Sequence, residues 1–149
     1  MDPSRPELID VGAVVPMLST GAIARLEYFR SLAHDVSRYY HGHPVYLVGG
    51  ALRDLEAEPR DVDLVCVLPD ATFRWMFGGG YDEWIVGRAW PDRGSGTWLR
   101  WAREVVKRSE QLTEEARRPI DFRLQHEKVA EHYASEPRLR LSVEIVPGR

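Results

Sequence analysis

The sequence contains little that would cross-link the chain or hold it in a membrane. Its single cysteine, Cys66, excludes an internal disulfide framework and fits a reducing compartment. No secretory leader and no apolar run near the length of a membrane span are present, so we expect a cytoplasmic protein without a membrane partner. The net charge of -3 argues against a general polyanion binder, although it leaves room for a local basic face.

Two frequent binding motifs are also missing. The pattern Gly-x-x-x-x-Gly-Lys-Ser/Thr does not occur, which excludes a P-loop, and we interpret the glycines at 78–80 as a loop. His41 and His43 lack the further cysteine or histidine that a tetrahedral zinc site requires, so we interpret them as solvated turn residues. The 149 residues, 44% apolar and 29% charged, instead fit one globular domain with its own core.

The chain is organised around residues 44–68. Val45–Val48 is a short apolar run, typical of a buried strand. Gly49 and Gly50 end it, and adjacent glycines permit a sharp turn with positive φ and a close approach of a ligand to the backbone. Ala51–Leu55 contains good helix formers, so free backbone N–H groups are expected beside Gly50, where they suit phosphate oxygens.

Two carboxylates open the next predicted strand. Asp61 and Asp63 lie two residues apart, so in a strand their side chains share one face. The opposite face is apolar and consists of Val62, Leu64, Cys66 and Leu68. Two carboxylates held close together repel each other, and a divalent cation such as Mg²⁺, bound together with substrate phosphates, removes that repulsion.

Several motifs of this stretch occur together and in order. The segment Val48-Gly49-Gly50-Ala51-Leu52-Arg53-Asp54 is followed by Arg60-Asp61-Val62-Asp63-Leu64. This combination closely resembles the head domain of bacterial-type tRNA CCA-adding enzymes and poly(A) polymerases, which belong to the DNA polymerase beta-like nucleotidyltransferase superfamily. The resemblance covers about 25 of the 149 residues.

The resemblance implies a site for a nucleoside triphosphate. The backbone of Gly49 and Gly50 would hold the triphosphate, and Arg53 would neutralise part of its charge. Asp54 matches the family's aspartate after that arginine, where a helix-capping or arginine-orienting role is the alternative to substrate contact. The implied cofactor is Mg²⁺, with two ions expected and Mn²⁺ as a substitute.

The superfamily also carries a third carboxylate on a later, neighbouring strand. Residues 120–125 alternate between apolar and polar side chains, which predicts a strand with Asp121 on its exposed face. By resemblance, the catalytic and metal-binding set is Asp61, Asp63 and Asp121, in which Asp121 acts as general base or completes the metal shell. Glu144, in the predicted last strand, is the rival for this role, and a purely structural Asp121 is the other alternative.

The remaining pattern predicts an α/β or α+β fold with one mixed sheet of about four or five strands and helices mainly on one face. Helical periodicity covers residues 22–40, after Ser19 and Thr20 as candidate N-caps. A second, long helix is expected to begin at a cap formed by Thr97. Glu83–Val86 is predicted as a short strand.

Three further segments receive a prediction. Residues 1–16, with three prolines, are interpreted as a loosely ordered N-terminal arm, and 17–149 as the nucleotidyltransferase-like domain. Residues 88–96 are interpreted as a surface loop; the alternative is a segment that brings an arginine to a phosphate and Trp90 to a base. We expect His126 to be a surface residue at the start of a helix.

Only about 80 residues follow the motif, too few for the further helical domains of a CCA-adding enzyme. We therefore expect a minimal stand-alone nucleotidyltransferase that transfers a nucleoside monophosphate from Mg-NTP to a hydroxyl of RNA such as tRNA, a protein or a small molecule. One alternative is a nucleotide-binding or regulatory module without turnover. Another is a structural domain in which Asp61 and Asp63 form ion pairs with Arg60 and Arg53.

Overall fold

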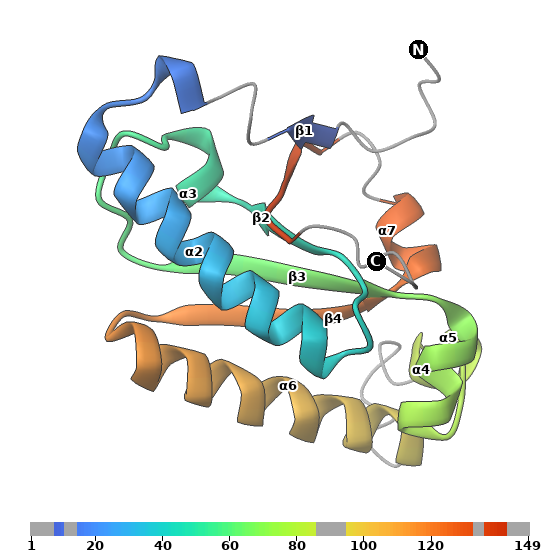
Figure 1. Ribbon diagram of the computed structural model, residues 1–149. Coiled ribbons are helices and arrows are strands. Elements are labelled where there is room, and N and C mark those ends of the chain that lie inside the picture. Colours follow the sequence, from blue (N-terminus) through green and yellow to red (C-terminus); the bar gives the residue numbers. More distant parts are fainter. Residues whose placement is uncertain (1–7, 11–14, 86–94, 133–135, 143–149) are drawn as a thin grey trace.

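Five strands form one mixed sheet in the order β1-β5-β2-β3-β4 (Figure 1), in which the two outer pairs are parallel and the inner pairs antiparallel. This computed structural model describes residues 8–10, 15–85, 95–132 and 136–142. The strands are β1 (Leu8–Asp10), β2 (Val45–Val48), β3 (Val62–Leu68), β4 (Ile120–His126) and β5 (Arg138–Arg140). The expected single-domain α+β fold with a mixed sheet is confirmed.

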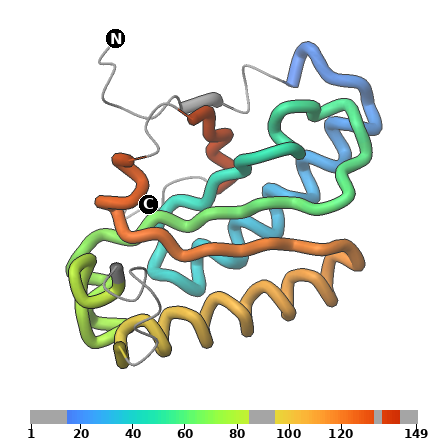
Figure 2. The backbone as a smooth tube through the Cα atoms, turned by 180° about the vertical axis from the view of Figure 1, so that it is seen from behind, coloured from blue at the N-terminus to red at the C-terminus, as the bar shows by residue number. Residues whose placement is uncertain are grey.

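Two long helices enclose the core on one face of the sheet, one lying across that face and the other along the edge strand β4. These are α2 (Thr20–Tyr39) and α6 (Gly96–Ala116). In Figure 1 α2 crosses in front of the strands, and in Figure 2, the view from behind, the strands cross in front of α2. The alternating apolar residues of β3 and β4 point into this core and are at most 3% exposed: Val62, Leu64, Cys66, Leu68, Ile120, Phe122 and Leu124. The polar residues between them therefore lie on the other face.

Helix α2 begins and ends close to the predicted positions. Ser19 is its N-cap, because the Ser19 Oγ accepts a hydrogen bond from the Ala22 N–H at 3.2 Å. The helix stops before His41, whose φ is 60°, and Gly42, whose φ is 80°. Residues with left-handed backbone angles cannot continue a right-handed helix. The chain therefore changes direction at these two residues and continues into β2.

Helix α6 covers the free edge of β4. The Ser109 hydroxyl accepts from the Phe122 N–H at 3.0 Å and donates to the Phe122 carbonyl at 3.1 Å. Thr113 forms the same pair of bonds with Ile120, at 2.9 and 3.3 Å. Four helical residues and two strand residues both advance the chain by about 6 Å, so consecutive turns of the helix reach consecutive bonding positions of the strand. The edge is thereby closed to other strands.

Two predicted element boundaries are wrong. Residues 83–85 of the predicted strand Glu83–Val86 are helical, because residues 81–85 form a helix in which the Glu83 carboxylate accepts from the Gly80 N–H at 3.0 Å; Val86 lies outside the described residues. Ser95, rather than Thr97, caps α6: the Ser95 Oγ accepts from the Trp98 N–H at 3.3 Å. Thr97 instead lies within the first turn of α6 and is buried.

The prediction for His126 is also wrong. The ring is only 3% exposed, and its Nε2 donates to the Asp70 carboxylate at 2.8 Å. Its Nδ1 accepts from the Lys128 N–H at 3.0 Å. His126 is therefore a buried link between the end of β4 and the helix that Asp70 begins, a partnership between segments far apart in the sequence.

Short helices complete the structure: a 3-10 helix at Val15–Met17, α3 (Gly50–Arg53), α4 (Asp70–Phe77), α5 (Tyr81–Ile85) and α7 (Glu127–His132). At the N-terminus, residues 8–10 of the predicted arm form β1, which pairs in parallel with β5. None of the helices in the described ranges is long and apolar enough to cross a membrane.

Candidate functional site

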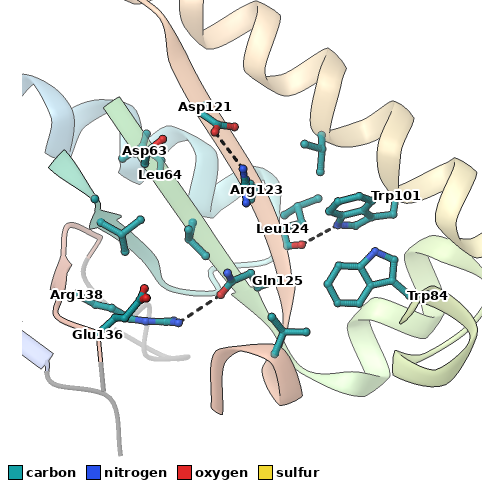
Figure 3. Close-up of a pocket in the computed structure, with 15 residues that line it drawn as sticks. Asp63, Leu64, Trp84, Trp101, Asp121, Arg123, Leu124, Gln125, Glu136 and Arg138 are labelled. Carbon is teal, nitrogen blue, oxygen red and sulfur yellow. Dashed lines mark hydrogen bonds and ion pairs between the residues drawn. The ribbon is translucent and has the colours of Figure 1, made fainter. Parts of the chain in front are cut away.

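The register of the sheet brings two of the predicted carboxylates together. Strands β3 and β4 are parallel, and Asp63 is paired directly with Asp121. Their strand neighbours Val62, Leu64, Ile120 and Phe122 are buried in the core, so both aspartates point to the opposite face. Figure 3 shows the two side chains next to each other on adjacent strands. The sequence predicted the face of each residue, and the parallel pairing makes them neighbours.

A cleft of about 710 Å³ lies along this polar face. Asp63, Asp121 and Gly49 belong to its lining, together with Arg123 and Gln125 further along β4. Figure 3 shows the indole rings of Trp84 and Trp101 beside β4, and the side chains of Glu136 and Arg138 on the other side. The cleft therefore combines carboxylates, arginines and aromatic rings, the side-chain types that bind metal ions, phosphates and bases.

Gly49 forms the sharp turn between β2 and α3. Its φ of 73° and ψ of -151° belong to a region of backbone conformation that is essentially restricted to glycine. A Cβ at this position would lie 2.5 Å from the Asp63 Oδ2. Gly50 differs, because a Cβ there would meet nothing within 4 Å. The first glycine is thus required both for the turn and for the space beside Asp63.

The short helix after this turn presents backbone donors. The N–H groups of Leu52 and Arg53 both bond the Gly49 carbonyl at 3.2 Å. The N–H groups of Gly50 and Ala51 have no hydrogen-bond acceptor within the described ranges. They are the donors that the sequence predicted for phosphate oxygens, and they lie at the turn beside the carboxylate pair.

The electrostatics of Asp63 reflect its crowded position. Burial raises the pKa of the Asp63 carboxyl above its ordinary value of 3.8, and the neighbouring charges of Asp121 and Asp61 raise it further. Arg123 opposes this effect and forms an ion pair with Asp121 at 3.4 Å. The ionised pair is therefore held together against its own repulsion, a condition that a bound cation would relieve.

Asp61 has a more peripheral place than the other two aspartates. It is exposed and immediately precedes β3, and its charge acts on Asp63. Among the residues that the structure describes, no group of three or more His, Cys, Asp or Glu side chains is arranged so that it could hold a metal ion. The protein ligands that lie together are thus the two carboxylates Asp63 and Asp121.

The two remaining predicted nucleotide contacts differ in their surroundings. Arg53 is exposed at the end of α3. The Asp54 carboxylate accepts a hydrogen bond from the Ala57 N–H at 3.3 Å, so it stabilises the turn that follows α3. That turn is held from α2 by Arg25, whose guanidinium donates to the Glu56 carbonyl at 2.9 Å. In this structure Asp54 thus has a local role, in which its carboxylate holds the turn after α3.

Two alternatives from the sequence can be compared with the structure. No ion pair joins Asp61 or Asp63 to Arg53 or Arg60 in the described part of the chain, which contradicts the structural reading of the two aspartates. Glu144 and the segment with Trp90 lie outside the described residues.

Sequence reasoning missed Arg138 as a residue of this cleft. Its signal was present, because Arg138 and Arg140 alternate with the buried Leu139 and Leu141 and so share the face of Asp63. The aromatic side of the cleft was missed as well. Trp101 belongs to the apolar stripe of α6, yet its Nε1 donates to the Leu124 carbonyl at 2.7 Å and its ring reaches the cleft.

Comparisons with known proteins identify no family for this chain. No protein-family model, curated protein or solved structure matches it.

Proposed function

We propose that the protein is a metal-dependent nucleotidyltransferase that transfers a nucleoside monophosphate from an NTP to a hydroxyl group. The observation that carries the proposal is the direct pairing of Asp63 with Asp121 beside the Gly49 turn. A carboxylate pair, a phosphate-binding turn and a cleft large enough for a nucleotide thus occur in one place. The single cysteine supports a cytoplasmic location for this activity.

The residues present fit Mg²⁺. Asp63 and Asp121 are adjacent carboxylates, and burial together with the neighbouring negative charges raises the pKa of Asp63, a cost that a bound cation lowers. Mg²⁺ in nucleotide sites is commonly bound by one or two carboxylates together with substrate phosphates, so a protein set of two is sufficient. Asp61 is close enough for its charge to act on Asp63. When bound, the ion supplies charge stabilisation for the phosphoryl oxygens.

Each side chain has a role in the proposed transfer. The N–H groups of Gly50 and Ala51 orient the triphosphate, and Arg53 is the nearby cation for its outer charge. Asp121 accepts the proton of the attacking hydroxyl. The hydroxyl oxygen forms a bond to the α-phosphorus while the bond to the bridging oxygen breaks, and pyrophosphate leaves. The acceptor is RNA such as tRNA, a protein or a small molecule.

One observation favours a second candidate function, a nucleotide-binding module without turnover. Only two of the three predicted carboxylates lie together, and the described residues contain no three-ligand metal group. Such a module would bind Mg-NTP in the same cleft and release no pyrophosphate. The two functions thus share the binding site and differ in the chemistry.

The proposal is tested by titrating each of the four NTPs, with and without Mg²⁺, against the wild type and Asp63→Asn. We expect Mg²⁺-dependent binding by the wild type and a loss of about tenfold or more in Asp63→Asn, because one of two charged ligands is removed. Asp35→Asn, an exposed aspartate on α2, is the matched control and should bind as the wild type does. A folded wild type that binds no NTP would refute the site.

Turnover separates the two candidate functions. Pyrophosphate release is measured with Mg-NTP and with RNA, protein and small-molecule hydroxyl acceptors. Pyrophosphate release by the wild type that Asp121→Asn loses supports the transferase. Binding by the wild type without release with any acceptor class supports the module.

A further inference from the structure

A buried arginine lies in the cleft without a carboxylate partner. Arg138 is the first residue of β5 and is only 4% exposed. Its Nη2 donates to the Gln125 Oε1 at 3.4 Å and to the Ala130 carbonyl at 3.5 Å, both at the long end of the hydrogen-bond range. Its Nε is buried and has no acceptor among the residues that the structure describes. Within the described ranges no ion pair includes Arg138.

This arrangement leaves a positive charge incompletely compensated. An arginine stays protonated in proteins, and a buried charge without a partner destabilises the fold. The Tyr46 ring lies 5.8 Å from the guanidinium carbon and supplies a modest cation–π contact. Glu136 also lines the cleft and acts on Arg138 at longer range, without forming an ion pair. Arg138 nevertheless lines the cleft and forms no ion pair within the described ranges, so an anion in the cleft would complete the compensation of its charge.

The position of the guanidinium sets it apart from the carboxylate pair. Gln125, which it contacts, lies four residues along β4 from Asp121, or about 13 Å in an extended strand. Figure 3 shows the Arg138 side chain extending toward Gln125 across the cleft. Strand β5 pairs with β2, with Leu139 opposite Leu47, and Gly49 and Arg138 line the same cleft. A ligand that begins at the Gly49 turn therefore has Arg138 along the same cleft wall.

We propose that Arg138 and Gln125 form an oxyanion subsite that holds a phosphate or carboxylate group in the cleft. The planar guanidinium presents paired donors that match the two oxygens of such a group, and the Gln125 amide adds a further donor. The identity of the group bound at this subsite rests on the proposed function. If the cleft binds Mg-NTP at Asp63, the subsite takes either a phosphate of that nucleotide or an anionic group of the acceptor.

The test introduces a carboxylate next to Arg138 by substitution. Gln125→Glu places a negative charge beside the Arg138 Nη2, so the guanidinium is neutralised and the fold is expected to be retained. The full chain is titrated with inorganic phosphate and, separately, with acetate, at an ionic strength held constant with chloride. The readouts are the thermal midpoint and the ¹⁵N-labelled arginine Nε–H signal that disappears in Arg138→Lys.

We expect phosphate or acetate to shift this signal and raise the thermal midpoint of the wild type. In Gln125→Glu the affinity should fall by about tenfold or more, because charge-assisted hydrogen bonds to the anion are replaced by an internal pair. Gln111→Glu is the matched control, since it makes the same change beside Arg108, which Gln111 contacts on α6. It should respond to the anions as the wild type does.

Two results would overturn the subsite: a wild type that responds to neither anion, or a Gln125→Glu variant that responds as strongly as the wild type. Either can occur while Mg-NTP still binds through Asp63, so failure of the subsite is distinct from failure of the proposed function. Given an anion response, weaker Mg-NTP binding in Gln125→Glu assigns the subsite to the nucleotide. Unchanged Mg-NTP binding assigns it to the acceptor.

Discussion

Gly49 and Gly50 are adjacent, but only the position of Gly49 requires a glycine. Gly49 has a φ of 73°, and a Cβ there would be 2.5 Å from the Asp63 Oδ2. Gly50 begins α3 and has free space around it. The turn therefore depends on one glycine only, and the two positions form an internal comparison.

Gly49→Ala is predicted to lower the free energy of unfolding by about 1–3 kcal/mol and to weaken Mg-NTP binding, because the side chain is strained and meets Asp63. Gly50→Ala should remain within about 1 kcal/mol of the wild type, since alanine suits a helix. Urea unfolding and nucleotide titration check both variants. Equal effects of the two substitutions would contradict this account of the turn.

Asp63 gives a prediction for pH dependence. Its pKa is raised in the folded protein, so between the ordinary value of 3.8 and the raised value the folded state binds more protons than the unfolded state. Wild-type stability therefore falls as pH rises through this window. Asp63→Asn should be more stable than the wild type at neutral pH, and the difference should shrink as pH falls below 3.8.

The measurement is urea unfolding of both proteins from about pH 7 to about pH 3, with a chelator present. Asp35→Asn on α2 serves as the control and should show no such trend. A destabilised Asp63→Asn at neutral pH would favour a structural role for this aspartate.

At the scale of elements, the contact between α6 and β4 closes the sheet. The hydroxyls of Ser109 and Thr113 each bond both backbone groups of one β4 residue. Asp121 lies between those two residues, so the same contact fixes the strand that carries it. The helix thereby stabilises the site without reaching the carboxylates through these hydroxyls.

Ser109→Ala is predicted to lower the free energy of unfolding by about 1–3 kcal/mol, because it leaves the Phe122 N–H and carbonyl without partners. The matched control is Ser31→Ala, an exposed position in α2, which should change stability by less than about 0.5 kcal/mol. Urea unfolding measures both. Stronger self-association of Ser109→Ala in sedimentation would further indicate an opened edge.

At the scale of the whole molecule, one buried tyrosine joins the helical layer to the sheet. Tyr40, at the end of α2, stacks on Phe122 of β4 with ring centroids 5.7 Å apart. Its hydroxyl donates to the Glu104 carboxylate at 2.7 Å and accepts from the Arg108 Nε at 3.1 Å, both on α6. Because layer and sheet are connected in this way, we expect a ligand bound at Asp63 to stabilise the entire fold.

Mg-NTP at 100 times its dissociation constant should raise the free energy of unfolding by about 2.7 kcal/mol, and removal of the metal with a chelator should reverse the gain. Thermal unfolding with and without the chelator measures this effect. Asp63→Asn should gain little from the same addition. A stabilisation that survives the chelator would show that the nucleotide binds without the metal.

Local pattern was sufficient for much of the fold. The alternation in β3 and β4 determined which side chains face the core, because successive residues of a strand point to opposite faces. The glycine pair located the turn, and Gly49 is the residue whose backbone angles few other residues tolerate. Helix α2 and its Ser19 cap followed from periodicity. The sequence alone therefore located Gly49, Asp63 and Asp121 and their faces, while the family resemblance and the activity stay predictions.

Only the tertiary structure determined the contacts between residues that are far apart in the sequence. The parallel register of β3 and β4 made Asp63 and Asp121 neighbours, and it is set by packing of the whole buried face. The burial of His126 and Arg138 follows from contacts with Asp70 and Gln125, which no local pattern contains. Sequence periodicity reports the direction of a side chain, whereas only the folded chain determines what that side chain meets.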